Sequence, residues 1–319
     1  MSGFIGTKLT MNLGERSYDI ILKNGALENL YQFARLDRRV AVVTDAGVPA
    51  EYAQRVADQC RDAKIITVPQ GEASKSMKIL ESVLRQMLEF NMGRGDLVIA
   101  VGGGVVGDLA GFAASIYMRG IDFINCPTTT LSMIDSSIGG KTAVDLGETK
   151  NIVGSFWQPK LVIVDPDTLS TLPRRHFING LAEAIKAGLL ADPELFSIFE
   201  KEDVDDRIGD IICRSLRFKK SIVEQDETEQ GMRKALNFGH TIGHGIEAVK
   251  GVKGRRTVGL YHGECVALGM LPMIESKALQ KRVRAVYRRL GLPLRTAYNK
   301  DKVYAEMLHD NCLLYTSPS

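Results

Sequence analysis

Residues 96–108 read DLVIAVGGGVVGD, and this stretch decides the fold of the first half of the chain. Its apolar run, Leu97–Val101, predicts a strand that is buried on both faces of a parallel sheet. The glycines that follow, ending at Gly107, match G-x-G-x-x-G between a strand and a helix. A backbone without Cβ atoms can close on a phosphate there, because amides at a helix N-terminus favour anions. A tight packing turn would explain the same glycines.

The turn differs from the usual dinucleotide fingerprint, because it lies late in the chain and no acidic residue ends a strand about twenty positions further on. The carboxylate that could hold a ribose is Asp45, at the end of an earlier predicted strand.

Strands and helices alternate on both sides of the glycine turn. We expect two short strands within residues 4–24, strands at 39–45, 63–69, 96–101, 123–131 and 161–165, and helices at 26–33, 49–62, 77–90 and from the glycine turn onward. Residues 135–142 read as a polar, glycine-rich loop. The alternation predicts an α/β domain with a parallel, doubly wound sheet.

Strand-like runs stop after Pro173, and the rest of the chain has the periodicity of helices. We expect helices at residues 180–190, 193–200, 208–224, 237–249, 263–277 and 281–290. The sequence therefore predicts two domains, an α/β domain of residues 1–172 and a helical domain of residues 173–319.

Residues 233–264 contain three of the five histidines of the protein. His240 and His244 are four residues apart in a predicted helix, so they project from one face. His262 follows in what reads as a glycine-rich loop. Two imidazoles and a carboxylate are a common ligand set for an open, catalytic metal site. Ordinary surface or core histidines are the alternative.

The candidate third ligand is Glu183, three residues before Lys186 on a predicted helix. A surface ion pair would explain this spacing equally well. Several cations stand near the glycine-rich stretches and favour an anionic, phosphorylated substrate: Lys141, Lys150, Lys186, Lys219 and Arg233. Each of them alone could be a solvated surface residue.

Composition excludes several classes of protein. The chain has 319 residues, of which 45% are hydrophobic, so it is long enough for two globular domains. A net charge of +3 is too small to indicate nucleic-acid binding. No apolar run approaches the ~20 residues of a membrane span, and no signal peptide opens the chain. Five scattered cysteines without C-x-x-C indicate free thiols in a reducing compartment, and we expect a cytoplasmic protein.

Together these motifs resemble the 3-dehydroquinate synthase family of sugar phosphate cyclases. The resemblance extends from about residue 15 to 310 and rests on Gly102–Phe112, Pro127–Thr129, Asp135–Val144, Lys150-Asn151, Ala182–Lys186, Leu236–His244 and His262–Glu264. It implies an N-terminal Rossmann-like domain, a C-terminal all-helical domain, a site in the cleft between them, and a homodimer.

The family converts a phosphorylated seven-carbon sugar acid, 3-deoxy-D-arabino-heptulosonate 7-phosphate, to 3-dehydroquinate and phosphate in the shikimate pathway. The resemblance implies transient oxidation by NAD, β-elimination of phosphate, re-reduction and an intramolecular aldol closure. It also implies a bound Zn2+ or Co2+ ion that acidifies the substrate hydroxyl.

The resemblance assigns roles to individual residues. The metal ligands would be Glu183, His240 and His262. The NAD contacts would be Asp45, Glu72, Lys75, Gly103, Gly104, Val105, Asp108, Thr128, Thr129, Lys141, Lys150, Thr168 and Thr171. The substrate contacts would be Asp135, Lys141, Asn151, Lys186, Lys219, Arg233, Asn237 and His244, while Arg119 would reach the phosphate site of a neighbouring subunit.

The tail departs from the family after Asp310, where two lysines, a strand and a helix are expected. The chain instead reads NCLLYTSPS from Asn311, which resembles a truncated or wrongly joined reading frame. We therefore expect this chain to have weakened activity and lower stability than a member of the family with the complete tail.

Three alternatives to the synthase stay open at this point. A related cyclase would share NAD, metal and fold but differ in substrate. A metal-dependent alcohol dehydrogenase of the glycerol dehydrogenase type would release NADH stoichiometrically. A catalytically inactive NAD-binding or scaffold protein would release no phosphate.

Overall fold

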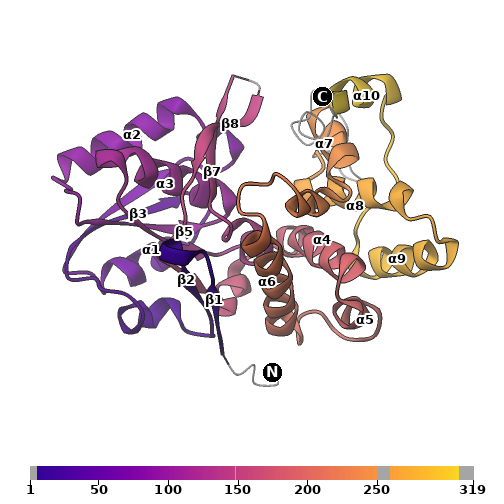
Figure 1. The fold of residues 1–319 in the computed structure, drawn as a ribbon, viewed down its shortest axis with the longest axis horizontal. Helices are drawn as coiled ribbons and strands as arrows, with labels where there is room; N and C mark the ends of the chain where they lie inside the picture. The colour runs from indigo at the N-terminus through magenta and orange to yellow at the C-terminus, as the bar shows by residue number, and fades with distance from the viewer. Residues whose placement is uncertain (1–5, 148, 250–258, 309–319) are drawn as a thin grey trace. The chain divides into compact units, whose positions relative to one another are not determined.

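The computed structural model describes residues 6–147, 149–249 and 259–308. The chain separates into two compact units, residues 1–172 and residues 173–319 (Figure 1). The expected departure of the tail from Asn311 onward lies outside the described residues.

A seven-stranded sheet forms the centre of the first unit. Its strands are β1 (Thr7–Met11), β2 (Tyr18–Leu22), β3 (Arg39–Asp45), β4 (Asp62–Val68), β5 (Leu97–Gly102), β6 (Asp122–Pro127) and β9 (Leu161–Val164). Their order is β1-β2-β9-β6-β5-β3-β4, and every pair is parallel except β1 with β2. The predicted parallel sheet is therefore confirmed, with one antiparallel strand at its edge.

Helices cover both faces of this sheet, as the predicted doubly wound arrangement requires. Alternate residues of β3 enter two different cores, with Val43 in one and Val42 in the other. Helices α2 (Met77–Glu89) and α3 (Gly104–Ile116) pack into the core that contains Val43, and α1 (Ala50–Ala57) packs into the core that contains Val42. Strand β5 is buried throughout, which explains why its sequence is apolar without alternation.

Three segments of the first unit differ from the prediction. Residues expected as a helix near 26–33 form the 3-10 helix η2 (Leu27–Gln32). The predicted strand 123–131 ends at Pro127 and leads to a π-helical turn, η5 (Ser132–Ser136). The expected loop at 135–142 ends in a hairpin of β7 (Lys141–Leu146) and β8 (Thr149–Phe156), which was not predicted.

The hairpin packs against α3 where a glycine leaves room. A Cβ atom on Gly111 would lie 2.5 Å from Cγ2 of Thr142, so only a glycine permits this approach. Thr142 and Val144 are buried, whereas β8 is largely exposed.

The expected helix 49–62 ends at Ala57, because the next strand already begins at Asp62.

The second unit is helical among its described residues, as expected. Its helices are α4 (Arg174–Leu190), α5 (Pro193–Lys201), α6 (Ile208–Gln225), α7 (His240–Ala248), α8 (His262–Met273), α9 (Lys277–Leu290) and α10 (Lys300–Leu308), with the 3-10 helix η7 (Met232–Asn237) before α7. Helix α10 was not predicted, and α4 begins earlier than expected.

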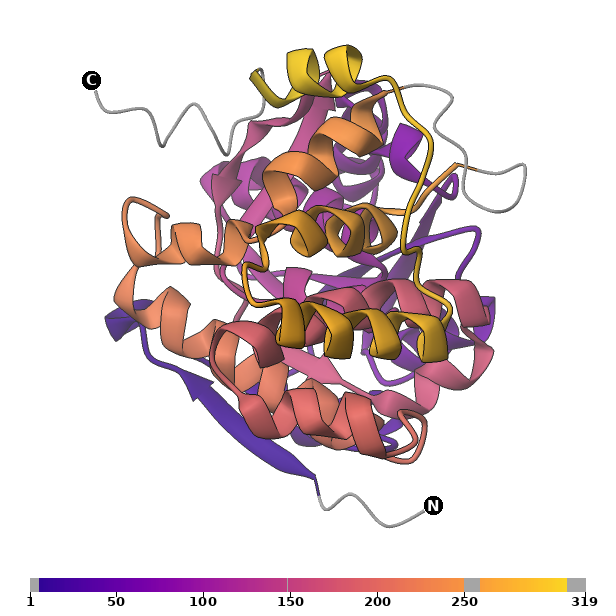
Figure 2. The ribbon, with the colours of Figure 1, turned by 90° about the vertical axis from the view of Figure 1, so that its right-hand side faces the viewer.

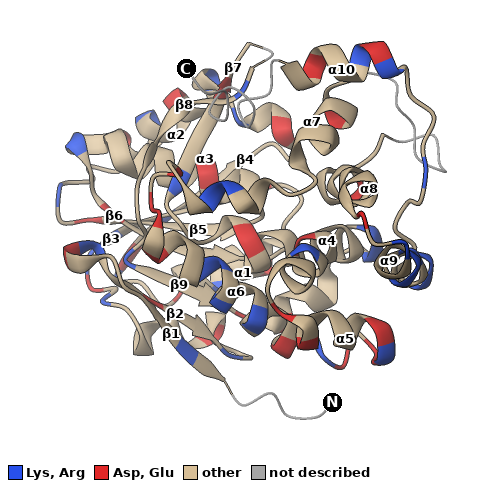
Figure 3. Cartoon of the chain, turned by 45° about the vertical axis from the view of Figure 1, so that its right-hand side comes forward, with Lys and Arg blue, Asp and Glu red and all other residues tan. Residues whose placement is uncertain are grey.

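Local sequence signals explain several helix ends of this unit. The carboxylate of Asp192 accepts a hydrogen bond from the Leu195 amide at the start of α5, and Gly291 ends α9 in the left-handed conformation. Helix α9 is rich in lysine and arginine (Figure 3), and its Arg282 forms a two-pronged ion pair with Glu200 of α5. Among the described residues, no helix combines the length and apolarity needed to cross a lipid bilayer.

Candidate functional site

A carboxylate and three imidazoles converge within the helical unit. Glu183 lies in the middle of α4, on the buried stretch Asn179–Gly188. Its Oε1 atom is 3.5 Å from Nε2 of His240 and 3.8 Å from Nε2 of His262. His240, His244 and His262 each offer a ring nitrogen within 4.8 Å of the other two. The structure thus brings the three expected ligands together, with His244 beside them.

Glycines allow the helices with these ligands to approach closely. A Cβ atom on Gly269 of α8 would lie 2.1 Å from the carbonyl oxygen of Gly239, which precedes α7 in a left-handed conformation. A Cβ atom on Gly263 would lie 2.0 Å from the carbonyl oxygen of Asn179 on α4. Any side chain at either glycine would separate the helices, which lie side by side in Figure 2.

The separations between Glu183 and the two imidazoles are close to those of a metal site. The Glu183 carboxylate is buried and pairs with the Lys186 ammonium through Oε2, and it has no further hydrogen-bond donor within the part of the chain that the structure describes. Zinc bonds of about 2.0–2.1 Å in a tetrahedron separate neighbouring ligand atoms by about 3.4 Å. The observed 3.5 and 3.8 Å separations are close to that value. The donor set therefore fits a divalent ion, and three donors would leave the fourth position of a tetrahedral ion for another ligand.

Neighbouring groups turn both Nε2 atoms toward Glu183. The Nδ1 atom of His262 donates to Oε2 of Glu247 at 2.9 Å, and Nδ1 of His240 faces the carbonyl oxygen of Phe238 at 3.4 Å. Such outer partners fix the tautomer and the orientation of a metal-binding imidazole. Sequence reasoning missed Glu247, although its spacing of seven residues from His240 and three from His244 places it on the same helix face.

The two imidazoles differ in their electrostatic surroundings. Burial, together with the charge of Lys186, holds the pKa of His240 well below its usual value, so this ring is neutral. Burial also lowers the pKa of His262, but the hydrogen bond and charge of Glu247 outweigh burial and raise the pKa overall.

Tyr287 is a further buried group close enough to be affected by the charge of Glu183. Burial, reinforced by that charge, raises the pKa of Tyr287, which therefore stays a neutral phenol.

The cations expected to hold the substrate are buried in this unit. Lys186 pairs with Glu183, and its Nζ donates to the carbonyl oxygen of Leu236 at 2.6 Å. Both side chains are at most 4% exposed, so they do not form a surface ion pair. Lys219 on α6 and Arg233 in η7 are also buried.

Two further predicted residues lie near the imidazoles in sequence. Asn237 ends η7, just before the helix that begins at His240. The ring of His244 is 5.2 Å from the ring of His240 and 5.6 Å from that of His262. The expectation that His262 lies in a loop is wrong, because it is the first residue of α8.

In the α/β unit, the glycine turn joins β5 to the N-terminus of α3. Gly103 caps the helix with extended backbone, and Gly104 begins it. A Cβ atom would lie 3.2 Å from Cγ2 of Thr129 if placed on Gly103, and 3.0 Å from Oγ of Ser136 if placed on Gly104. Close packing thus explains part of the glycine pattern. The first amides of α3, including that of Val105, have no acceptor within the helix and can face an anion.

Asp45 ends β3 and lines a hollow of about 410 Å³, together with Thr44, Gly47 and Thr67. Its Oδ1 atom accepts a hydrogen bond from the Gly47 amide at 2.7 Å, so the carboxylate also shapes the turn. Thr44 lines the same hollow, and its buried hydroxyl has no hydrogen-bond partner among the described residues. A hollow at the carboxyl end of a parallel strand is a usual place for a ligand.

Three of the predicted contact residues lie around a fourth, Lys75. Its buried Nζ donates to Oδ2 of Asp108 at 2.6 Å and to Oδ1 of Asn151, and it lies 4.0 Å from Oε1 of Glu72. Burial lowers the pKa of Lys75, but the neighbouring carboxylates outweigh burial and raise it. Asn151 adopts a left-handed φ of 55° on β8. The cluster links the start of α3 to the hairpin.

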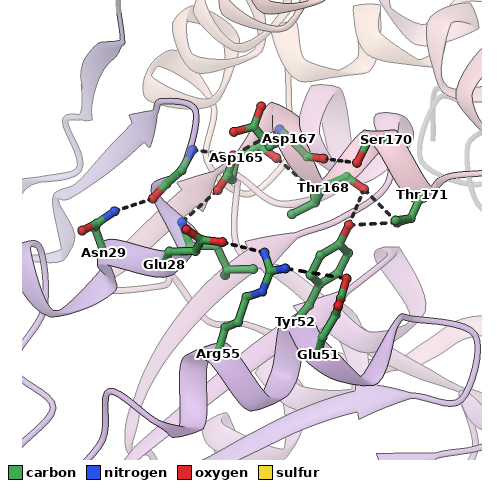
Figure 4. A network of polar contacts seen from close by, with 12 residues as sticks. Glu28, Asn29, Glu51, Tyr52, Arg55, Asp165, Asp167, Thr168, Ser170 and Thr171 are labelled. Carbon is green, nitrogen blue, oxygen red and sulfur yellow. Dashed lines mark hydrogen bonds and ion pairs between the residues drawn. The ribbon is translucent and has the colours of Figure 1, made fainter.

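The remaining predicted residues lie in other parts of the α/β unit, apart from Thr128 and Thr129, which adjoin the glycine turn. In the 3-10 helix η6 (Pro166–Thr171), the hydroxyl of Thr168 donates to the carbonyl oxygen of Asp165, just before the helix, and that of Thr171 donates to the carbonyl oxygen of Thr168. Thr171 also contacts the hydroxyl of Tyr52 (Figure 4). Thr129 Oγ1 lies 2.8 Å from Ser132 Oγ, and the Thr128 amide donates to Gly102. Asp135 lies in η5 rather than in a loop, Lys141 and Lys150 are exposed on the hairpin, and Arg119 is exposed with a left-handed φ of 69°.

The fold is that of the sugar phosphate cyclases. The structure is similar to 2-epi-5-epi-valiolone synthase from Streptomyces hygroscopicus, solved with NAD+ and Zn2+ bound, with a TM-score of 0.82 and 29% identity over 93% of this chain and 87% of the other. Within that class, residues 65–179 match 3-dehydroquinate synthase N-terminal and residues 180–312 match 3-dehydroquinate synthase C-terminal. The chain belongs to the 3-dehydroquinate synthase family.

Two curated relatives have the same description. The chain is 40% identical to the 3-dehydroquinate synthase of Thermodesulfovibrio yellowstonii, over 92% of this chain and 86% of the relative. It is 43% identical to that of Clostridium beijerinckii, over 82% of this chain and 77% of the relative.

Proposed function

We propose that this chain is an NAD- and metal-dependent lyase that converts 3-deoxy-D-arabino-heptulosonate 7-phosphate to 3-dehydroquinate and phosphate. The observation that supports this most directly is the convergence of Glu183, His240 and His262 at metal-site spacing. The relatives named above as 3-dehydroquinate synthases support the choice of substrate.

The three residues hold a divalent ion, zinc or cobalt, and Glu247 orients His262. When bound, the ion supplies a Lewis acid and NAD supplies a reversible hydride acceptor. In this proposal the α/β unit binds NAD through the glycine turn, the Asp45 hollow and the Lys75 cluster. The helical unit binds metal and substrate.

Basic and polar side chains bind the substrate in this proposal. Lys186, Lys219 and Arg233 hold its phosphate and carboxylate by charge-assisted hydrogen bonds. His244, one turn after His240, is placed to hydrogen-bond the substrate or move a proton. The departing phosphate can itself accept a proton, so the reaction does not require a protein base.

The proposal includes a homodimer in which the exposed Arg119 reaches the phosphate site of the partner. It also includes a cytoplasmic location, in agreement with the absence of a disulfide among the four cysteines of the described residues.

The test is phosphate release from the heptulosonate phosphate with NAD below the substrate concentration, with and without a chelator. We expect phosphate in excess of NAD, no net NADH, and loss of turnover in chelator that Zn2+ or Co2+ restores. Stoichiometric NADH would instead indicate a dehydrogenase, and NAD binding without phosphate release would indicate an inactive protein.

A related cyclase is the second candidate, because the valiolone synthase has the same fold. A panel of sugar phosphates decides between them. Preference for a substrate other than the heptulosonate phosphate would overturn the choice of substrate and leave the metal centre in place.

A further inference from the structure

The start of α8 is held by a network of contacts from α4. Helix α8 begins at His262, and Glu264 in its first turn accepts a hydrogen bond from the Tyr261 amide at 2.9 Å. The Glu264 amide donates in turn to Oδ1 of Asn179 at 3.2 Å. Because the first amides of a helix lack intrahelical acceptors, such contacts decide where the helix begins. They therefore decide where His262 lies.

Arg175 contacts the chain on both sides of His262. Its Nε and Nη2 atoms donate to the two carboxylate oxygens of Glu264 at 2.8 and 2.7 Å, in a two-pronged ion pair. Its Nη2 atom also donates to the carbonyl oxygen of Gly259 at 2.7 Å. The guanidinium lies 4.0 Å from the ring centre of Tyr261, on which the ring of His176 also stacks. One side chain thus spans residues 259 to 264.

This arrangement ties two metal-ligand helices together. Arg175 is in the first turn of α4, and Glu183 lies eight residues further along that helix, about 12 Å at 1.5 Å per residue. Of the proposed ligands, His262 is the most exposed, with 30% of its side chain accessible against 12% for His240 and 2% for Glu183. A ligand at a partly exposed helix start depends on its neighbours for its position more than one in the middle of a buried helix.

We propose that Arg175, through Glu264, is a positioning residue that sets the affinity of the metal centre by fixing His262. The inference rests on the proposed function, because it requires that Glu183, His240 and His262 bind a divalent ion. Arg175 contacts neither metal nor substrate in this account. Loss of an outer partner of a metal ligand lowers metal affinity by about 10- to 100-fold, and we expect about tenfold here because Arg175 acts through Glu264.

The experiment titrates metal-free protein with Co2+ and records its visible absorption spectrum and dissociation constant. The variants are Arg175→Gln, Arg175→Lys, Glu264→Gln and the double variant Arg175→Gln/Glu264→Gln. Arg174→Gln is the matched control, because Arg174 is adjacent on α4 but pairs with the exposed Asp205. The melting temperature of each metal-free variant is measured in parallel.

We expect the Co2+ dissociation constant to rise about tenfold in Arg175→Gln, with an altered spectrum, and not to change in Arg174→Gln. Lysine keeps the charge but not the two-pronged geometry, so Arg175→Lys should recover part of the affinity. The double variant should bind Co2+ no more weakly than the single variant with the lower affinity, because the two residues act through one contact.

Two results would overturn the inference. One is a fall in melting temperature with dissociation constant and spectrum unchanged, which would make the pair merely structural. The other is a loss of Co2+ affinity in the double variant that equals the sum of the losses, as free energies, in the two single variants. Failure of the wild-type protein to bind Co2+ at all would instead refute the proposed metal centre.

Discussion

Replacing Glu183 by glutamine should have two separable effects, on stability and on metal binding. The side chain keeps its size, but the buried Lys186 loses its charged partner and retains the bond to Leu236. Removing one member of a buried ion pair costs about 3–5 kcal/mol, because the other charge stays buried. For a unit of this size we expect the melting temperature to fall by on the order of 10 °C.

The assay is urea and thermal unfolding in the presence of a chelator, so that metal binding does not contribute to stability. The double variant Glu183→Gln/Lys186→Met removes both charges and should recover most of the lost free energy of unfolding. Neither variant should retain Zn2+ after dialysis, whereas the wild-type protein should. The two readouts therefore separate the structural role of the carboxylate from its role as a ligand.

The control for this series is Asp205→Asn, which breaks the exposed pair with Arg174 and should cost less than about 1 kcal/mol. If Glu183→Gln in chelator were as stable as the wild-type protein, the buried pair would contribute nothing. If the double variant were no more stable than the single one, the loss would not come from the unpaired Lys186. Zinc retention by Glu183→Gln would show that the carboxylate is not a ligand.

Three further outcomes are expected. His262→Ala should lose both zinc and turnover, and an active variant without metal would contradict the ligand assignment. Gly269→Ala should destabilise the helical unit by several kcal/mol in a urea titration, because its Cβ would lie 2.1 Å from the Gly239 carbonyl oxygen. The control is Gly95→Ala, which has open space around it and should change the free energy of unfolding little. Burial alone would raise the pKa of Asp192, but the Leu195 amide at the start of α5 and the guanidinium of Arg214 outweigh burial and lower the pKa. The contribution of Asp192 to stability is therefore present above about pH 3.8 and is lost as the pH falls below that value. Asp192→Asn, which can still cap the helix, should therefore weaken the acid-side loss of stability, and an unchanged unfolding profile between pH 5 and pH 2 would refute this.

The parallel sheet could be predicted because its strands are buried on both faces. Strand β3 matches the predicted residues 39–45, since the apolar run and the buried strand coincide. The hairpin could not be predicted in the same way. Strand β8 is largely exposed, and the glycines before Lys141 read as a loop. Likewise, α10 buries only Val303 among its described residues, so its sequence has little helical periodicity.

Of the candidate site, the local spacing could be predicted from the sequence, whereas the long-range contacts could not. The spacing of His240 and His244 is local, so a helix face could be inferred from sequence alone. The distances from Glu183 to His240 and His262 join helices 57 and 79 residues apart in sequence, and only a tertiary structure supplies them. The role of Glu247 needs its contact with His262, because an isolated glutamate on a helix is usually a solvated residue.

The position of the first residue of α8 affects what fixes His262. A helix expected from Gly263 leaves His262 in a loop, where nothing fixes its ring. With the helix beginning at His262, its position depends on the capping of that helix by Glu264 and thus on Arg175. A capping contact, ordinarily a matter of about 1 kcal/mol of stability, then becomes a determinant of metal affinity. Functional residues at helix ends should therefore be sought together with the groups that cap those ends.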